Sequence, residues 1–391
     1  MRTSLARANL VHNKVRTLVA IAGVAFAVVL IFMQLGFIGA LETTANLIYN
    51  ALRFDICIRS KDYVHFSQAG TFPMRRLHQA ASVAGVQRLC PFYAELNLWR
   101  IPPGSKYAGQ KRGVLTMGIR PRDPVFRLQE LQNQATLRLV EPDRMLIDRE
   151  TRRDFGPRNG RRFGDQDVAA GVETEIGDKR VRIVGHFSMG AGFAANGSII
   201  MNDRGFARVT ATRTENDVTL GLIQLDPGAP IARTASALRR ILPDDVEVLT
   251  RPQVLSQEKN YWVWQTTYGF IFQTGVVIAL VVGTVIVYQV LSSDVANLLP
   301  EYATLKALGY RDRYLAGVVL KQALALSILG FIPGLLISLL LYYITSSLAN
   351  IPIRMTWFNF LFVLALSTMM CTISGLGAMR KTFTADPADL F

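Results

Sequence analysis

Four long stretches without a single charged residue most constrain how this chain folds. They are Thr17–Leu41, Asn260–Ser293, Gln322–Ile353 and Met355–Met379. A helix that crosses a membrane needs about 20 mostly apolar residues, and each stretch is longer than that. The alternative, four helices buried in a soluble core, does not fit runs so long and so free of charge. The sequence therefore predicts four transmembrane helices, over residues 18–41, 266–293, 322–348 and 355–379.

The first apolar stretch has an alternative interpretation as a cleaved signal peptide, because basic residues precede it. A signal peptide has an apolar run of about 7–15 residues that ends at a small-residue cleavage site. Here Leu18–Ile38 alone holds 13 Leu, Ile, Val and Phe residues, and no A-x-A site ends the run. We therefore expect the segment to remain in the protein as its first transmembrane helix.

The segment between the first and second apolar stretches has the composition of a soluble domain. Residues 42–259 hold 32 Lys and Arg and 24 Asp and Glu, about one charged residue in four. Residues 218–249 read as strand, helix and strand, which favours a mixed α/β domain. Further strand candidates are residues 53–59, 86–101, 114–119, 180–184 and 198–201. The predicted fold class is an α+β membrane protein, with a domain over residues 42–265 that divides into two subdomains.

Lys and Arg in the short connecting segments predict the orientation in the membrane. Ten lie in the N-terminus, the 294–321 loop and the tail, whereas the loop between the third and fourth helices holds one, Arg354. Basic loops stay cytoplasmic. We expect an amphipathic cytoplasmic N-terminus (residues 1–17), a cytoplasmic loop (294–321), a cytoplasmic tail (380–391) and a periplasmic large domain. The predicted location is the bacterial inner membrane.

Cys57 and Cys90 both fall in the predicted outer domain, where oxidising conditions allow a disulfide to persist. Two cysteines do not make a framework, and sequence alone does not fix the distance between them. The sequence therefore leaves a Cys57–Cys90 disulfide open. Cys371 falls in the fourth apolar stretch and is expected to be a small apolar residue there.

The motifs of a catalytic or metal-binding protein are missing from the sequence. The segment Gly104–Lys111 resembles a phosphate-binding loop, but Gln110 stands where the loop needs Lys. No zinc-binding or nucleophile-elbow motif is present, and the four histidines are dispersed. We expect no catalytic residue, no bound metal and no cofactor. The net charge of +14 invites a nucleic-acid interpretation, but the arginines are scattered and the domain that holds most of them is predicted to lie outside the membrane.

The predicted spans contain no ionisable side chain, which argues against an ion-coupled carrier. They do contain small residues at helical spacing, which let helices pack closely. These candidate packing residues are Gly275, Ala279, Gly283, Gly330 and Gly334. The sequence leaves open whether they pack within one chain or against a second copy.

The loop over residues 294–321 holds a predicted short helix with a marked start and end. Pro300 suits the first turn of a helix, and Glu301 complements its positive end. Gly309 is placed as the left-handed residue that ends it. Leu305 and Leu308 would be exposed unless another surface covers them, so the helix would either rest on lipid or dock a soluble partner.

The same loop carries a resemblance to a known family. Residues 300–310, PEYATLKALGY, resemble the loop of ABC-transporter permeases of the MacB/FtsX/LolC type, in which an acidic residue precedes a Leu-Lys-Ala-Leu/Met-Gly core. The order of one span, a large outer domain and three spans is also similar. The resemblance is closest to DevC-like exporter permeases, which share the LPEYATLKA form and the following Gly-Phe-x-Pro-Gly, here Gly330–Gly334.

The resemblance implies a role without a channel through the membrane. Motion of a separate ATPase, which binds the ATP and Mg, would pass through the loop and the spans to the outer domain (mechanotransmission). The implied coupling residues are Pro300, Glu301, Tyr302, Leu305, Lys306, Leu308 and Gly309. The implied partners are the ATPase, a second permease copy, a periplasmic adaptor and an outer-membrane channel of a tripartite efflux system. A non-transporting regulator of an extracytoplasmic enzyme, like FtsX, is the alternative, and the transported substrate stays open.

Overall fold

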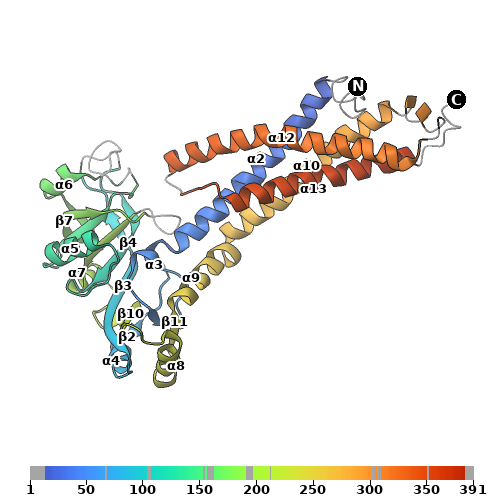
Figure 1. Ribbon diagram of the computed structural model, residues 1–391. Helices are drawn as coiled ribbons and strands as arrows, with labels where there is room; N and C mark the ends of the chain where they lie inside the picture. The colour runs from blue at the N-terminus through green and yellow to red at the C-terminus, as the bar shows by residue number, and fades with distance from the viewer. Residues whose placement is uncertain are drawn as a thin grey trace. The chain divides into compact units, whose positions relative to one another are not determined.

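A computed structural model describes residues 14–66, 68–103, 107–152, 155, 163–190, 197–211, 213–298, 300–301, 304–305, 308, 310–349 and 352–383. The chain forms two compact units. Figure 1 labels their helices and strands. One unit joins residues 1–40 to residues 263–391 and is built from helices. The other unit, residues 41–262, is built around a sheet and corresponds to the predicted outer domain, whose name it keeps here. Most of the predicted N-terminal segment 1–17 and most of the tail 380–391 lie outside the described residues.

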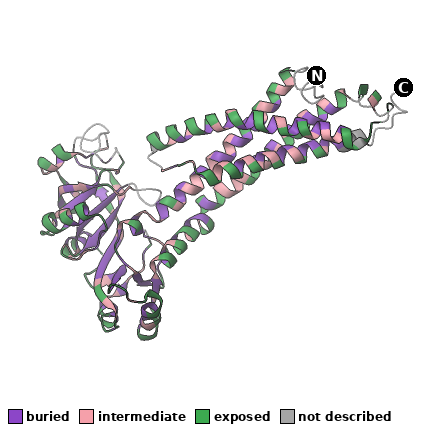
Figure 2. Cartoon of the chain, viewed as in Figure 1, coloured by how far each residue is buried: buried purple, intermediate pink, exposed green. Residues whose placement is uncertain are grey.

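Among its described residues, the helical unit contains four helices that are long and apolar enough to cross a membrane. They are α2 (Lys14–Ala45), α10 (Thr267–Asn297), α12 (Asp312–Ala349) and α13 (Trp357–Phe383). Helix α13 packs against both α10 and α12. Many large apolar residues on these helices are exposed, as expected for surfaces that face lipid, and Figure 2 colours the exposed residues of the helices green. The predicted fold class, four apolar helices with a mixed α/β domain between the first two, is confirmed.

The helices extend beyond the predicted spans because a charged side chain does not end a helix. Helix α12 begins at Asp312, ten residues before the predicted start at 322, and α10 continues to Asn297 rather than 293. The segment between α10 and α12 is therefore only residues 298–311. The outer domain ends with α9 (Arg251–Asn260), and a π-helical turn, η2 (Tyr261–Gln265), separates α9 from α10.

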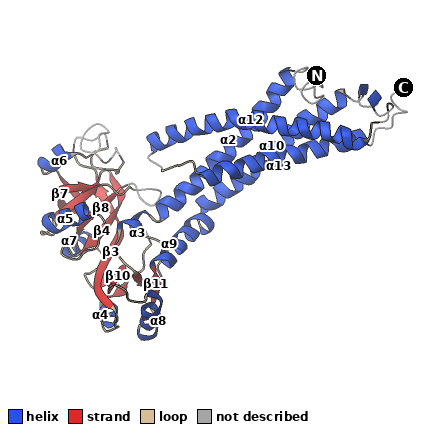
Figure 3. Cartoon of the chain, viewed as in Figure 1, coloured by secondary structure: helices blue, strands red, loops and turns tan. Residues whose placement is uncertain are grey.

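The outer domain is built on one nine-stranded mixed sheet, drawn in red in Figure 3. In spatial order its strands are β11 (Val246–Thr250), β1 (Ile56–Ser60), β10 (Leu220–Leu225), β3 (Val86–Arg100), β4 (Lys111–Ile119), β8 (Ser198–Asn202), β5 (Arg144–Asp148), β7 (Lys179–Phe187) and β6 (Glu173–Ile176). The pairs β4–β8 and β5–β7 are parallel, and the other pairs are antiparallel. A separate small pair joins β2 (Phe72–Pro73) to β9 (Asp217–Val218).

Seven helices accompany the strands of the outer domain. They are α3 (Leu47–Ala51), α4 (Arg75–Ala80), α5 (Gln129–Arg138), α6 (Asp165–Ala169), α7 (Asp203–Val209), α8 (Ile231–Ile241) and α9. Those that contact the sheet include α7 on β4, α5 on β7 and α8 on β11. These are the helices of the described residues only.

Strand β3 joins the two ends of the sheet. Its first half pairs with β10 and its second half with β4, and its last residues also pair with β6. Strands β3, β4, β8, β5, β7 and β6 therefore close into a ring. A strand shared by both parts of the sheet connects them within one compact unit, and the division into two subdomains stays a prediction.

Side chains from alternate positions fill two apolar cores, one on each face of the sheet. Ile56 and Ile58 of β1 enter one core, and Cys57 between them enters the other. The alternation over residues 53–59 predicted a strand, and β1 lies at its end. Every residue of β1 is buried, because β10 and β11 flank it and both faces are covered.

The open question of a Cys57–Cys90 disulfide is resolved against pairing. Cys57 lies opposite Leu222 of β10, and Leu222 lies opposite Cys90 of β3, so one whole strand separates the two cysteines. Two strand spacings are about 10 Å, beyond the roughly 7 Å that a disulfide allows between Cα atoms. Both thiols are free and buried, and burial raises the pKa of each to about 12.

The turn between β6 and β7 requires a glycine, which gives a stability prediction. Gly177 has a φ of +55°, and a Cβ there would overlap the carbonyl oxygen of Val209. Gly109 has a φ of +82° but has open space around it. We expect Gly109→Ala to cost about 1 kcal/mol from backbone strain and Gly177→Ala at least twice as much. Thermal unfolding of the full chain in detergent measures both, and equal losses would contradict the packing around Gly177.

Candidate functional site

The coupling segment, residues 298–311 between α10 and α12, is the first candidate site. Pro300, Glu301, Thr304 and Leu305 are helical, and the Thr304 hydroxyl donates a 2.9 Å hydrogen bond to the Pro300 carbonyl. The predicted coupling residues Tyr302, Lys306 and Gly309 lie outside the described residues, and their roles stay predictions.

Two backbone hydrogen bonds mark the end of this short helix. The Leu308 amide donates to the Thr304 carbonyl at 3.0 Å, and the Tyr310 amide donates to the Leu305 carbonyl at 3.1 Å. The second bond runs from residue 310 to residue 305, a separation typical of the C-terminal end of a helix.

Most of the described residues of the coupling segment are exposed, and Leu298 and Leu305 are half-buried. Glu301 is exposed and makes no ion pair with another described residue, and Leu308 is 71% exposed. Tyr310 and Tyr314 lie with their ring centroids 4.9 Å apart, and both are exposed. An unpaired carboxylate beside exposed apolar side chains is a surface suited to docking a protein.

The predicted small residues of α12 lie against α2. A Cβ on Gly330 would stand 2.5 Å from Val24 Cβ, and one on Gly334 would stand 2.7 Å from Val28 Cγ1. Both distances are too short for real atoms, so only glycine lets the two helices approach this closely. These glycines therefore lie in a contact within the chain, which was one of the two alternatives.

The small residues of α10 also face neighbouring helices. Gly275 lies against Gln34, Gly283 lies against Ala27 and Met370, and Ala279 between them is 1% exposed. Hydroxyl groups add contacts among the same helices: the Ser374 hydroxyl donates to the Thr284 carbonyl at 2.8 Å. The four helices therefore pack through close backbone approach and a few hydrogen bonds.

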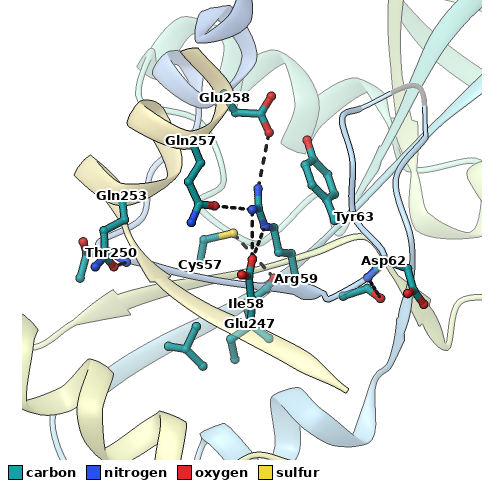
Figure 4. A network of polar contacts seen from close by, with 12 residues as sticks. Cys57, Ile58, Arg59, Asp62, Tyr63, Glu247, Thr250, Gln253, Gln257 and Glu258 are labelled. Atoms are coloured by element: carbon teal, nitrogen blue, oxygen red, sulfur yellow. Dashed lines mark hydrogen bonds and ion pairs between the residues drawn. The ribbon is translucent and has the colours of Figure 1, made fainter. Parts of the chain in front are cut away.

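A buried polar network in the outer domain is the second candidate site, and Figure 4 shows it. Arg59 of β1 is its centre. Its guanidinium lies 3.0 Å from Glu247 of β11 and 3.6 Å from Glu258 of α9, and it also donates to the Gln257 side chain. It stacks over the Tyr63 ring at 4.6 Å from the centroid. The Arg59 side chain is 9% exposed, so these partners replace water around a buried cation.

Glu258 connects this network to the beginning of the outer domain. The Tyr49 hydroxyl of α3 lies 3.3 Å from Glu258 Oε1 and 2.9 Å from the Tyr63 hydroxyl. Burial raises the pKa of Glu258 to about 7, against the opposing effects of the Tyr63 hydroxyl and of Arg59. Burial likewise raises the pKa values of Tyr49 and Tyr63, so both phenols are neutral.

Sequence reasoning missed this network because its members are far apart in the chain. Arg59 ends the alternating stretch 53–59, which predicted a strand and gave no sign of its charged partners. Glu258 sits in a polar helix with no apolar face. Only the pairing of β1 with β11 brings them together, and no local signal in the sequence indicates it. Within the part of the chain that the structure describes, no cluster of His, Cys, Asp and Glu fits a metal ion.

The fold and the coupling segment define a class of protein: a multi-pass membrane protein with one large α/β domain after its first span. Residues 274–387 match the family model described as FtsX-like permease C-terminal. This segment of the chain is therefore similar to the C-terminal domain of FtsX-like permeases. The resemblance to MacB/FtsX-type permeases is confirmed, and the closer resemblance to DevC-like permeases stays a prediction.

Two solved structures resemble the outer part of the chain. The periplasmic region of MacB from Actinobacillus actinomycetemcomitans is 8% identical, with a TM-score of 0.36, covering 55% of this chain and 96% of that chain. The extracellular domain of the noncanonic ABC-type transporter YknZ from Gram-positive bacteria is 12% identical, with a TM-score of 0.32. The match covers 50% of this chain and 99% of that chain. At such low TM-scores, neither likeness contributes to the functional argument. The curated proteins give no match.

The contact between α2 and α12 generates a prediction with a matched control. Gly334→Leu forces a side chain into Val28 and the Ala25 carbonyl, so we expect it to destabilise the helical unit by about 1–3 kcal/mol. Gly317→Leu in the same helix meets open space and should be neutral or slightly stabilising, because leucine favours helix more than glycine does. Melting temperatures in detergent compare the two, and equal values would argue against the close approach.

Proposed function

We propose that this chain is the permease subunit of an ABC-type exporter that works with a separate ATPase. The observation that carries the proposal is the coupling segment: exposed Glu301 and Leu308 lie inside the region that matches FtsX-like permeases. A docked ATPase would cover the exposed leucine and supply a cation for the carboxylate. The ATP and its Mg would be bound by that partner, and this chain would act without a catalytic residue.

The proposed mechanism is mechanotransmission. ATP-driven closure of two ATPase subunits would move the coupling segments of two permease copies. Helix α10 ends at this segment and helix α12 begins at it. Movement of the segment would therefore move the spans themselves. Close glycine contacts make the helical unit stiff, because closely packed interiors transmit displacement rather than absorb it. The spans carry no ionisable group at their centres, which suits work done on a substrate outside the membrane.

The proposal includes a location and further partners. The ten-to-one asymmetry of Lys and Arg supports an inner-membrane protein with a cytoplasmic coupling segment and a periplasmic outer domain. A second permease copy, a periplasmic adaptor and an outer-membrane channel would complete a tripartite efflux system. The second candidate function is an FtsX-like regulator of an extracytoplasmic enzyme, which the same family match favours; an adaptor that copurifies with the permease would support the exporter.

Copurification tests the docking role of the coupling segment. We expect Glu301→Lys combined with Lys306→Glu to reduce the copurified ATPase at least tenfold, because interface charges would meet like charges. A matched control exchanges the exposed ion pair of the outer domain, Lys61→Glu with Asp244→Lys, which keeps the same net charge. Undiminished ATPase in the first variant would refute the docking role, and the control should behave as wild type.

Cysteine labelling tests the orientation. Ser236 on α8 and Thr304 in the coupling segment are both exposed, whereas the native thiols are buried and should not react. In intact cells without an outer membrane, an impermeant maleimide should label Ser236→Cys at once. Thr304→Cys should react only after the membrane is permeabilised. The reverse pattern would overturn the proposed orientation.

A further inference from the structure

The buried network around Arg59 ties together the first and last segments of the outer domain. The domain begins at Leu41 and ends at Trp262. Near these ends, Lys259 pairs with Glu42 at 3.0 Å, and Arg251 donates to the carbonyls of Leu52 and Tyr49 at 2.9 and 3.0 Å. The bond between Glu258 and Tyr49 is the buried member of this set. The two segments that continue into the spans are therefore held to each other through α9 and α3.

The charges in this network do not balance when every group is ionised. Arg59 faces two carboxylates, Glu247 at 3.0 Å and Glu258 at 3.6 Å. Glu247 is 40% exposed and keeps contact with water, but Glu258 is 2% exposed. The ionised network thus buries a surplus negative charge, whereas a protonated Glu258 leaves one cation opposite one carboxylate. A buried unbalanced charge is costly, so the proton is favoured at Glu258.

We propose that Glu258 operates a proton-dependent latch: protonated, it holds α9 against α3 and β1, and ionised, it loosens this attachment of the two ends of the outer domain. The consequence for transport rests on the proposed function, because a loosened attachment would transmit less of the movement of the spans. The latch itself is a property of the permease alone.

The direction of the pH effect follows from linkage. In the closed state burial raises the pKa of Glu258 to about 7, whereas a Glu258 released into water would return to the ordinary value of 4.5. The closed state therefore binds the proton more tightly than the open state. Its advantage is complete at low pH and declines as the pH rises from 4.5 through about 7. Between pH 6 and pH 8 the equilibrium constant for opening should rise about tenfold.

The other titratable groups around Glu258 do not provide this response. Tyr49, Tyr63 and Cys57 have pKa values raised by burial and stay neutral. His65 lies beside the Tyr261 and Trp262 rings, 5.6 Å from each centroid, and burial lowers its pKa. His65 would therefore lose its proton at a lower pH than an ordinary histidine does. The remaining neighbours are Arg59 and Glu247 in the network itself and the Lys259–Glu42 ion pair beside it.

Hydrogen exchange of the full chain in lipid nanodiscs tests the latch. Amides of residues 47–52 and 255–262 are followed at pH 6 and pH 8, with correction for the intrinsic pH dependence of exchange. Wild type should show about a tenfold greater opening at pH 8 in both segments. Residues 86–100 of β3 serve as the internal reference and should not change. Equal protection at the two pH values in residues 47–52 and 255–262 would overturn the proposal.

Three variants separate the latch from general stability. Glu258→Gln mimics the protonated acid and should hold both segments closed at both pH values. Glu247→Gln leaves Glu258 as the carboxylate that faces Arg59. The guanidinium then favours ionised Glu258 more strongly, so the pH at which the two segments open should fall. His65→Asn should keep the wild-type response. A pH response that survives Glu258→Gln, or disappears in His65→Asn, would refute the latch. Since no ATPase is present, failure here is distinct from failure of the copurification that tests the proposed function.

Discussion

The absence of water from the membrane interior is the constraint on which this structure depends. Backbone amides and carbonyls there must bond to each other, which a helix does within itself. Helix α12, with 38 residues, and α2, with 32, satisfy this requirement over more than the hydrocarbon thickness. Because lipid offers no hydrophobic drive for helices to associate, contact between them depends on close approach. Gly330 and Gly334 on α12 allow this close approach, because the missing side chains leave room for Val24 and Val28 of α2.

The outer domain solves a different problem, which is to hold charged groups in a folded core. The Arg76 side chain is 10% exposed and donates to Asp245 through two guanidinium nitrogens. Arg59 is similarly enclosed by two carboxylates and an amide. Both arginines join a strand or helix early in the domain to residues near its end. Paired guanidinium groups therefore connect distant parts of the chain where apolar packing alone carries no directional preference.

The sequence predicted those features that depend on local composition. Runs without charge located the four helices, and β-branched patterns located β3, β7, β8 and β10 within a few residues. Prediction failed where the answer depends on strand neighbours. The alternation around Cys57 could not show that β1 lies between β10 and β11, and the same missing neighbour order left the Cys57–Cys90 distance open. Strand β5 was missed because Arg144–Asp148 is short and ends in a buried aspartate, which three backbone amides and Ser198 stabilise.

The closed ring of six strands affects how copies of this protein can associate. Because β6 returns to pair with β3, β11 is the one strand of the nine-stranded sheet, as described here, with a single partner. Free strand edges recruit other strands, so exposed edges promote aggregation when proteins are crowded. Here the free edge is only five residues long, carries Glu247, and is followed at once by Arg251 and Pro252. A crowded membrane could therefore hold many copies side by side with little risk that their sheets merge.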